Sequence, residues 1–143
     1  ETHLIPVALN TALGKRESMS IFGTDYPTPD GTNIRDYVHV EDLIDAHVRA
    51  MDRIEIGQVE AFNVGIGKGY SVREILDSVR RVSGVDFPVH ESERRAGDAI
   101  ALYNDPTRIK SALGWDAKIT DIDEVVGSAW SWFQKHPNGY GDK

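Results

Sequence analysis

Apolar residues recur every three or four positions in several stretches of the chain, and this spacing predicts amphipathic helices. A Ser71-to-Glu74 capping box opens one of these stretches, and Gly84 ends it. Asp105-Pro106 and Gly114 bound a further, short helix, with Asp105 as its N-cap. The helices predicted from the spacing cover residues 4–12, 41–54, 71–83 and 121–136.

The helix predicted at 41–54 begins at Glu41 and Asp42, whose carboxylates suit an N-terminal cap. One of its faces is apolar apart from a histidine, and this face is expected to point inward. Its residues are Leu43, Ala46, His47, Ala50, Met51 and Ile54.

Short runs of β-branched and aromatic residues predict strands between the helices. These runs are Met19–Phe22, Tyr37–Val40, Ala61–Gly65 and Phe87–His90. A stretch rich in Pro, Gly, Asp and Asn at 24–33 and a charged stretch at 91–98 predict loops. Strands and helices alternate in places, but the strands are too short and too few for a doubly wound sheet. The pattern therefore predicts one incomplete α/β unit that spans residues 1–143, and a chain that begins inside a helix looks cut.

Composition excludes several classes of protein. The chain carries 16 basic and 23 acidic residues, a net charge of -7, which argues against a general nucleic-acid binder. It has no cysteine, so it forms no disulfide and no thiolate metal site. No apolar run approaches the roughly 18 to 20 residues that span a bilayer, and the first residues do not resemble a secretory signal. We expect a cytoplasmic protein with no membrane partner.

Clustered arginines and acids are the strongest candidate chemistry. Arg94, Arg95 and Asp98 share a predicted loop, and Arg35-Asp36 lies upstream. Guanidinium groups beside a carboxylate suit capture of a phosphate or diphosphate, with the acid accepting hydroxyl protons from a ribose or sugar. The alternative is a solvated cluster of surface salt bridges, which is common and weakly stabilising.

The other candidate motifs point to structure. Gly65 to Tyr70 lies between a predicted strand and a predicted helix, but Tyr70 occupies the place of the third glycine in a dinucleotide-binding loop, so a tight turn is favoured. The histidines lack the spacing of metal ligands, and no serine lies in a nucleophile elbow. The remaining acids are interpreted as helix caps and surface charge, and the tryptophans as packing residues.

Several longer motifs carry a resemblance to a known family. Residues 21–43, which include the run Arg35-Asp36-Tyr37-Val38-His39-Val40, resemble UDP-glucose 4-epimerases of the extended short-chain dehydrogenase/reductase family. Similar motifs occur at 62–65, 94–98, 113–115 and 136–140. The likeness covers essentially the whole chain and corresponds to the C-terminal, substrate-binding part of that family. It implies an incomplete Rossmann-type α/β fold without the N-terminal NAD-binding half.

The resemblance also implies contacts to a UDP-sugar. Ile21 and Phe22 correspond to residues that line the uracil pocket, Arg35 and Arg95 to those that hold the diphosphate, and Asp98 to the acid that binds ribose hydroxyls. Leu102 corresponds to a side chain that lies against the hexose near its 2-position, where the family has a tyrosine or a smaller residue. Further contacts are implied for Thr2, His3, Leu4 and Ser20, with His3 replacing the family's asparagine.

The family's catalytic parts are not in this sequence. Its glycine-rich NAD loop, its catalytic Ser or Thr and its Tyr-x-x-x-Lys base lie upstream, and no Tyr-x-x-x-Lys occurs here. We therefore expect no catalytic, cofactor-binding or metal-binding residue in the chain, no NAD bound by it alone, and no activity without the missing half. The expected partners are a UDP-sugar, that N-terminal half and a second copy of the protein.

The sequence is compatible with three functions. The first is part of an epimerase that interconverts UDP-glucose and UDP-galactose in galactose metabolism. The second is part of a related UDP-pentose 4-epimerase or sugar-nucleotide dehydratase. The third is a free-standing, non-catalytic binding or interaction module.

Overall fold

The computed structural model describes residues 2–141, and the chain divides into two compact units. Unit 1 consists of Glu1–Asn33, Ser71–Ile100 and Asp121–Lys143. Unit 2 consists of Ile34–Tyr70 and Ala101–Thr120. Each unit is therefore built from segments that are far apart in the sequence.

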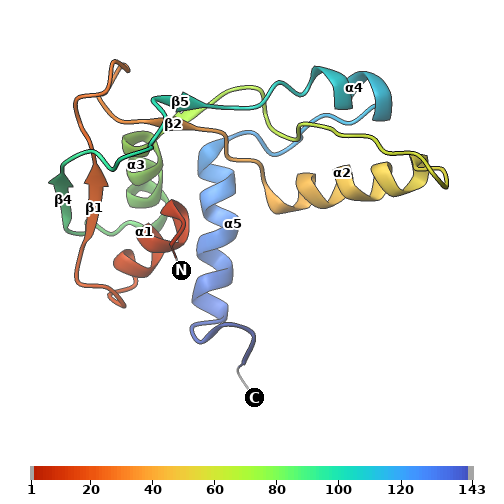
Figure 1. Ribbon diagram of the computed structural model, residues 1–143. Coiled ribbons are helices and arrows are strands. Elements are labelled where there is room, and N and C mark those ends of the chain that lie inside the picture. Colours follow the sequence, from red (N-terminus) through yellow and green to blue (C-terminus); the bar gives the residue numbers. More distant parts are fainter. Residues whose placement is uncertain (1, 142–143) are drawn as a thin grey trace. The chain divides into compact units, whose positions relative to one another are not determined.

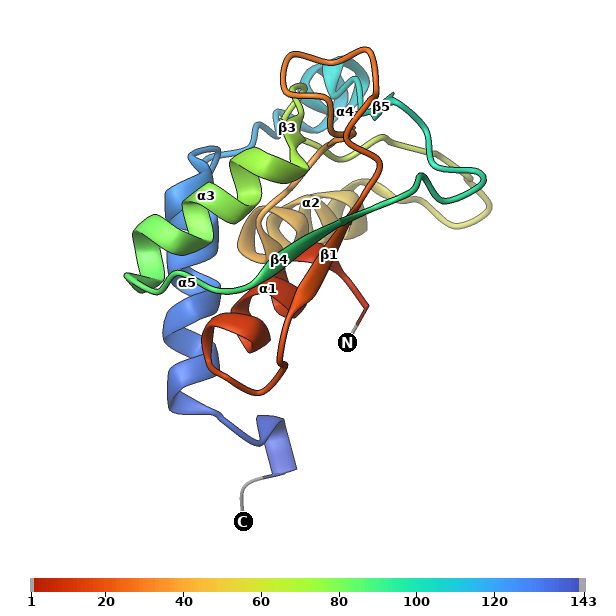
Figure 2. The same cartoon turned by 90° about the vertical axis from the view of Figure 1, so that its left-hand side faces the viewer.

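Unit 1 is a helical layer beside a two-stranded parallel sheet (Figure 1). Its helices are α1 (Leu4–Ala12), α3 (Val72–Ser83) and α5 (Ile122–Lys135), which contact one another, and a short 3-10 helix, η1 (Gly139–Gly141), follows. Strands β1 (Met19–Phe22) and β4 (Val89–Ser92) lie side by side (Figure 2). Apolar side chains from α1, α3 and α5 are buried in this unit: Ala8, Leu9, Ile75, Leu76, Val79, Val125 and Val126.

The start and end of α3 follow the sequence prediction closely. The Ser71 hydroxyl accepts a hydrogen bond from the Glu74 backbone N–H, and the Glu74 carboxylate accepts one from Ser71 N–H. Gly84 ends the helix in the left-handed conformation, with φ of 70°. At the start of α5, the Asp121 carboxylate is the N-cap and accepts the backbone N–H groups of Asp123 and Glu124.

Unit 2 contains α2 (Val40–Arg53), α4 (Thr107–Leu113) and the two-residue strands β2 (Ile34–Arg35) and β5 (Ala101–Leu102). A third two-residue strand, β3 (Tyr70–Ser71), lies at the boundary, with Tyr70 in unit 2 and Ser71 in unit 1. The strand order is β3-β2-β5, and β2 and β5 run parallel. Ala46, Ile109 and Trp115 form the buried centre of the unit.

Two predicted strands are wrong. Tyr37–Val40 and Ala61–Gly65 contain no strand: residues 36–39 are irregular, and Val40 is the first residue of α2. Their β-branched and aromatic composition favours extended backbone, but a strand also needs a neighbour, and neither segment pairs with one in the described part of the chain. The strand predicted at Phe87–His90 is displaced to Val89–Ser92, and β2, β3 and β5 were not predicted.

The predicted helix caps and the inward face of α2 also need correction. His39, not Glu41 or Asp42, caps α2, since its Nδ1 accepts the Glu41 N–H at 3.2 Å. Pro106 rather than Asp105 is the N-cap of α4, although the Asp105 carboxylate accepts the Thr107 N–H. Ala46 is buried, but several apolar positions of α2 and the following segment are exposed: Val40, Ile44, Val48, Met51 and Ile54.

None of the helices in residues 2–141 combines the length and the apolar character that crossing a membrane requires.

Asp42 is a buried anchor of unit 2, with 4% of its surface exposed. Its carboxylate accepts the backbone N–H groups of Lys118 and Ile119 at 3.0 and 2.8 Å. Its own carbonyl accepts the indole N–H of Trp115 at 3.0 Å. One residue therefore ties α2 to the segment that follows α4.

Replacing Asp42 by alanine should lower the free energy of unfolding by about 3 kcal/mol, because two backbone donors lose a charged acceptor. Urea denaturation measures this loss. The matched control is Asp116→Ala, which breaks an exposed ion pair to Lys110 and should cost less than about 1 kcal/mol. Equal losses in the two variants would show that Asp42 is not an anchor.

Asp30 ties the loop after β1 to the start of α3. Its Oδ1 accepts the Thr32 backbone N–H at 2.9 Å and the Thr32 hydroxyl at 2.8 Å, and its Oδ2 accepts the Ser71 hydroxyl. Burial acts to raise the pKa of Asp30, but the hydrogen bonds from Ser71 and Thr32 outweigh it and hold the pKa below its ordinary value of 3.8. The ionised form is therefore the one that stabilises the fold.

A lowered pKa in the folded state gives a stabilisation that is complete above pH 3.8 and is lost as the pH falls through the folded-state pKa. The difference in unfolding free energy between the native chain and Asp30→Asn should accordingly be largest near neutral pH and shrink in acid. Urea denaturation at a series of pH values between 7 and about 3 tests this. A difference that stays constant over this range contradicts the assignment.

Candidate functional site

Residues at the end of β1 differ sharply in burial. Ser20 is half-buried, Ile21 is only 3% exposed, and Phe22 is 37% exposed. The Ile21 side chain is therefore part of the core, whereas the Phe22 ring is partly open to contact. Phe22 pairs with Ser92 in the parallel sheet, and Gly23 N–H continues the pairing to the Ser92 carbonyl at 2.9 Å.

Phe22, Arg95 and Asp98 come together in unit 1. The Arg95 guanidinium lies over the Phe22 ring, 4.4 Å from its centroid. Arg95 Nε is 3.3 Å from Asp98 Oδ2, and a turn with Gly97 at φ of 88° brings Asp98 N–H to within 3.3 Å of the Arg95 carbonyl. The Arg95 side chain remains 62% exposed. A stacking surface, a cation and an acid are thus adjacent and accessible.

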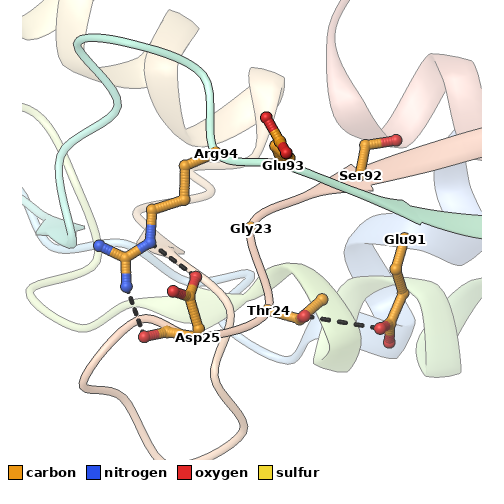
Figure 3. A pocket seen from close by; sticks show the side chains of 7 residues that line it. All are labelled: Gly23, Thr24, Asp25, Glu91, Ser92, Glu93 and Arg94. Atoms are coloured by element: carbon orange, nitrogen blue, oxygen red, sulfur yellow. Dashed lines mark hydrogen bonds and ion pairs between the residues drawn. The ribbon is translucent and has the colours of Figure 1, made fainter.

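The neighbouring Arg94 has different partners. It lines a pocket of about 420 Å³ together with Gly23–Asp25 and Glu91–Glu93 (Figure 3). Its Nε donates to Asp25 Oδ1 at 2.7 Å, and its guanidinium lies 4.3 Å from the centre of the Tyr26 ring. The hydrogen bond and the charge of Arg94 hold the pKa of Asp25 below its ordinary value. The two arginines that the sequence placed in one anion site therefore have separate surroundings.

Arg35 and Leu102 face each other in unit 2. They are register partners in the parallel β2–β5 pair, and Asp36 N–H donates to the Leu102 carbonyl at 3.2 Å. The Arg35 guanidinium donates to the Ile34 carbonyl at 2.7 Å. Leu102 is 63% exposed, so its side chain is available to a ligand.

Asp36 organises the glycine-rich stretch rather than adding to an anion site. Its two carboxylate oxygens accept the backbone N–H groups of Ile66 and Asn104, both at 3.1 Å. Gly65 packs so closely on this carboxylate that a Cβ there would clash with it. Sequence reasoning missed this role, although an aspartate beside a short strand and a glycine later in the chain were visible signals.

The remaining predicted contacts lie at the start of unit 1. Thr2 and His3 are exposed, and Leu4 is the first residue of α1. His3 occupies the N-cap position, but its side chain does not accept a hydrogen bond from the helix. The roles of these three residues and of Ser20 in ligand binding stay predictions.

The ligand contacts predicted from the sequence are distributed over the two units. Arg95, Asp98 and Phe22 belong to unit 1, and Arg35 and Leu102 belong to unit 2. Within each unit the expected residues are adjacent, and the pairing of Arg35 with Leu102 and of Arg95 with Phe22 gives each half a defined local geometry.

Comparison with known proteins bears on the family to which the chain is similar. The model of the NAD dependent epimerase/dehydratase family matches residues 1–65. A UDP-glucose 4-epimerase of Lacticaseibacillus casei is 44% identical over the whole chain, which covers 44% of that relative. A probable UDP-arabinose 4-epimerase of Oryza sativa subsp. japonica is 46% identical over 92% of this chain, which covers 32% of the length of that relative. The chain thus spans less than half the length of these relatives.

Solved structures match equally well. A UDP-glucose 4-epimerase structure has a TM-score of 0.92 and 47% identity, covering 99% of this chain and 44% of that one. The enzyme of Bifidobacterium longum, solved with NAD+ and UDP, has a TM-score of 0.91 and 38% identity over 98% of this chain and 42% of its own. The UDP-Glc/GlcNAc 4-epimerase of Campylobacter jejuni has a TM-score of 0.84 and 43% identity, covering 92% of this chain and 40% of its own.

These matches confirm the α/β fold class expected from the sequence motifs, including its correspondence to part of an extended short-chain dehydrogenase/reductase. Over its whole length, the chain is a homologue of the C-terminal part of UDP-glucose 4-epimerases.

Proposed function

We propose that this chain is the UDP-sugar-binding portion of an epimerase that interconverts UDP-glucose and UDP-galactose in galactose metabolism. The observation that carries the proposal is the exposed group formed by Phe22, Arg95 and Asp98. In a chain of net charge -7, an accessible guanidinium on an aromatic surface is a specific place for an anionic, aromatic ligand.

Each member of this group suits one part of UDP. The Phe22 ring offers a face for the uracil base, since every base has a face that stacks on an aromatic side chain. The Arg95 guanidinium matches the geometry of diphosphate oxygens, and Asp98 can accept the hydroxyl protons of a ribose. By the motif resemblance, Arg35 corresponds to a second arginine that holds the diphosphate.

The chemical step needs groups beyond this chain. Bound NAD would supply the acceptor for a hydride from C4 of the sugar and return it to the opposite face. The residues described here do not fit NAD: Tyr70 replaces the third glycine of the binding fingerprint, and Asp36 occupies the Ile66 N–H. Tyr-x-x-x-Lys is also missing from the sequence. Binding of the cofactor and proton transfer are accordingly assigned to the N-terminal half of the longer protein.

The apolar face of α2 and the segment after it favour a protein partner. Val40, Ile44 and Val48 lie four residues apart on one side of the helix and are 63%, 57% and 52% exposed. Ile56 and Val59 beyond its end are fully exposed. An exposed apolar stripe of this kind marks an interaction surface, and we propose that it binds the N-terminal half of the protein. We further propose that the protein is cytoplasmic and forms homo-oligomers.

A UDP-pentose 4-epimerase is the second candidate. It is favoured by the similarity to a probable rice UDP-arabinose 4-epimerase, which at 46% matches the bacterial UDP-glucose enzymes in identity. Assay of the full-length protein with UDP-hexoses and UDP-pentoses separates the two functions.

Binding of UDP tests the site directly. Titration calorimetry should detect weak UDP binding by this chain, and Arg95→Ala should remove most of it, since a charge-assisted hydrogen bond contributes about 1.5–3 kcal/mol. Arg81→Ala is the matched control, because Arg81 forms a two-point ion pair with Asp123 between α3 and α5, outside the proposed site. The chain with added NAD should show no epimerase turnover. Equal affinity for UDP and pyrophosphate would reject the uridine pocket.

Leu102 should determine which sugars the full-length protein accepts. Leucine lacks the ring and phenolic oxygen of the tyrosine found in some relatives, so it leaves space for an acetamido group at the sugar's 2-position, and a pocket excludes bulk by steric overlap. We expect turnover of both UDP-glucose and UDP-N-acetylglucosamine, and loss of the N-acetyl activity in Leu102→Tyr. If the native protein lacks N-acetyl activity, or the tyrosine does not reduce it, Leu102 is not the determinant.

A further inference from the structure

Two consecutive arginines, Arg94 and Arg95, follow β4 and differ in their exposure and in the number of their hydrogen bonds. Arg95 has a side chain 62% exposed and a hydrogen bond of 3.3 Å to Asp98. Arg94 is 43% exposed and holds Asp25 at two points, since its Nε donates to the carboxylate and its Nη2 to the Asp25 carbonyl. Figure 3 shows this guanidinium fork spanning both oxygens.

The Arg94 side chain also packs on Gly23 and Tyr26. Tyr26, which is only 5% exposed, lies under the guanidinium with its ring centre 4.3 Å away. Gly23 has φ of 83°, and a Cβ there would lie 2.5 Å from Tyr26 Cε2 and 2.6 Å from Arg94 Cγ. The absence of a side chain at Gly23 therefore allows Arg94 to pass directly over the backbone and reach Tyr26 and Asp25.

The loop that contains Asp25 and Tyr26 is stabilised by hydrogen bonds within itself. Tyr26 N–H donates to the Gly31 carbonyl at 2.9 Å, and the Thr28 hydroxyl donates to the Thr32 carbonyl at 2.6 Å. The loop that holds Arg94 is thus closed by its own hydrogen bonds, so Arg94 is attached to a fixed point of unit 1.

We propose that Arg94 is a positioning residue: by binding Asp25 and packing on Tyr26 it fixes the backbone from which Arg95 reaches a diphosphate. This inference rests on the proposed function, because it takes Arg95 as the diphosphate ligand. Arg95 and the turn at Gly97 follow Arg94 directly in the chain. The conformational freedom of their backbone therefore depends on the contacts of Arg94 with Asp25 and Tyr26. Holding this backbone before the ligand arrives reduces the conformational entropy lost on binding, and the gain is measured as affinity.

The test is Arg94→Lys, which keeps the positive charge but loses the planar two-point fork. UDP affinity should fall about tenfold, the factor that one net hydrogen bond contributes, and pyrophosphate affinity should fall by the same factor because the base is not involved. Asp25→Asn, which weakens the grip from the other side, should lower both affinities in the same direction. The matched control, Arg81→Lys, alters a similar two-point pair to Asp123 and should leave both affinities unchanged.

Thermal unfolding separates positioning from general stability. The melting temperature of Arg94→Lys should fall no further than that of Arg81→Lys, while only the former loses affinity. Combining Arg94→Lys with Arg95→Lys should cost little more affinity than Arg95→Lys alone, because Arg94 acts through Arg95.

The possible failures can be told apart. If UDP binds the native chain and Arg95→Ala abolishes binding, but Arg94→Lys stays within twofold of native affinity, the inference is wrong and the proposed function stands. Additive losses in the double variant would show that Arg94 contacts the ligand itself, which also overturns the inference. If UDP does not bind the native chain at all, the proposed function fails, and the positioning role fails with it.

Discussion

Aspartate carboxylates that accept backbone N–H groups from distant segments are the interaction on which this structure depends. The strands are two to four residues long, so sheet hydrogen bonds can join only a small part of the backbone. Asp36 joins β2 to the segments at Ile66 and Asn104, and Asp42 joins α2 to residues 118–119. These carboxylates take the place of strand neighbours in holding irregular segments.

Aspartate carboxylates, with backbone or side-chain donors, also hold the segments that carry the proposed site residues. In unit 2, the Asp36 backbone N–H donates to the Leu102 carbonyl, and the Asp36 carboxylate accepts the Asn104 N–H. Both hydrogen bonds stabilise the register in which Arg35 pairs with Leu102. In unit 1, Asp30 ties the loop after Phe22 to α3, and Asp25 receives Arg94. A carboxylate accepts several donors at once and its hydrogen bonds are charge-assisted, which suits it to fixing loops that have no regular ladder.

Helices were predictable from the sequence because their signals are local. The Ser71–Glu74 box and Gly84 lie within the turns that they stabilise, and α3 begins and ends at them. Strands were less predictable, since Tyr37–Val40 has strand-forming residues but no neighbour to pair with in residues 2–141. The acids were interpreted as caps and surface charge, but Asp42 is a buried acceptor for residues more than seventy positions away. Such a partner is set by tertiary structure and leaves no local pattern.

The site shows the same division between composition and geometry. The cluster of Arg94, Arg95 and Asp98 was visible in the sequence, and the motif resemblance named Phe22 as a neighbour in function. Charge and length do not separate two adjacent arginines, and only the motif resemblance assigned the diphosphate to Arg95 rather than to Arg94. Their difference lies in what each side chain contacts: Arg94 reaches Tyr26 and Asp25, and Arg95 reaches Phe22. Two residues of identical chemistry therefore differ in exposure and in partners: Arg94 is bound to Asp25, and the more exposed Arg95 is the one that we propose as the diphosphate ligand.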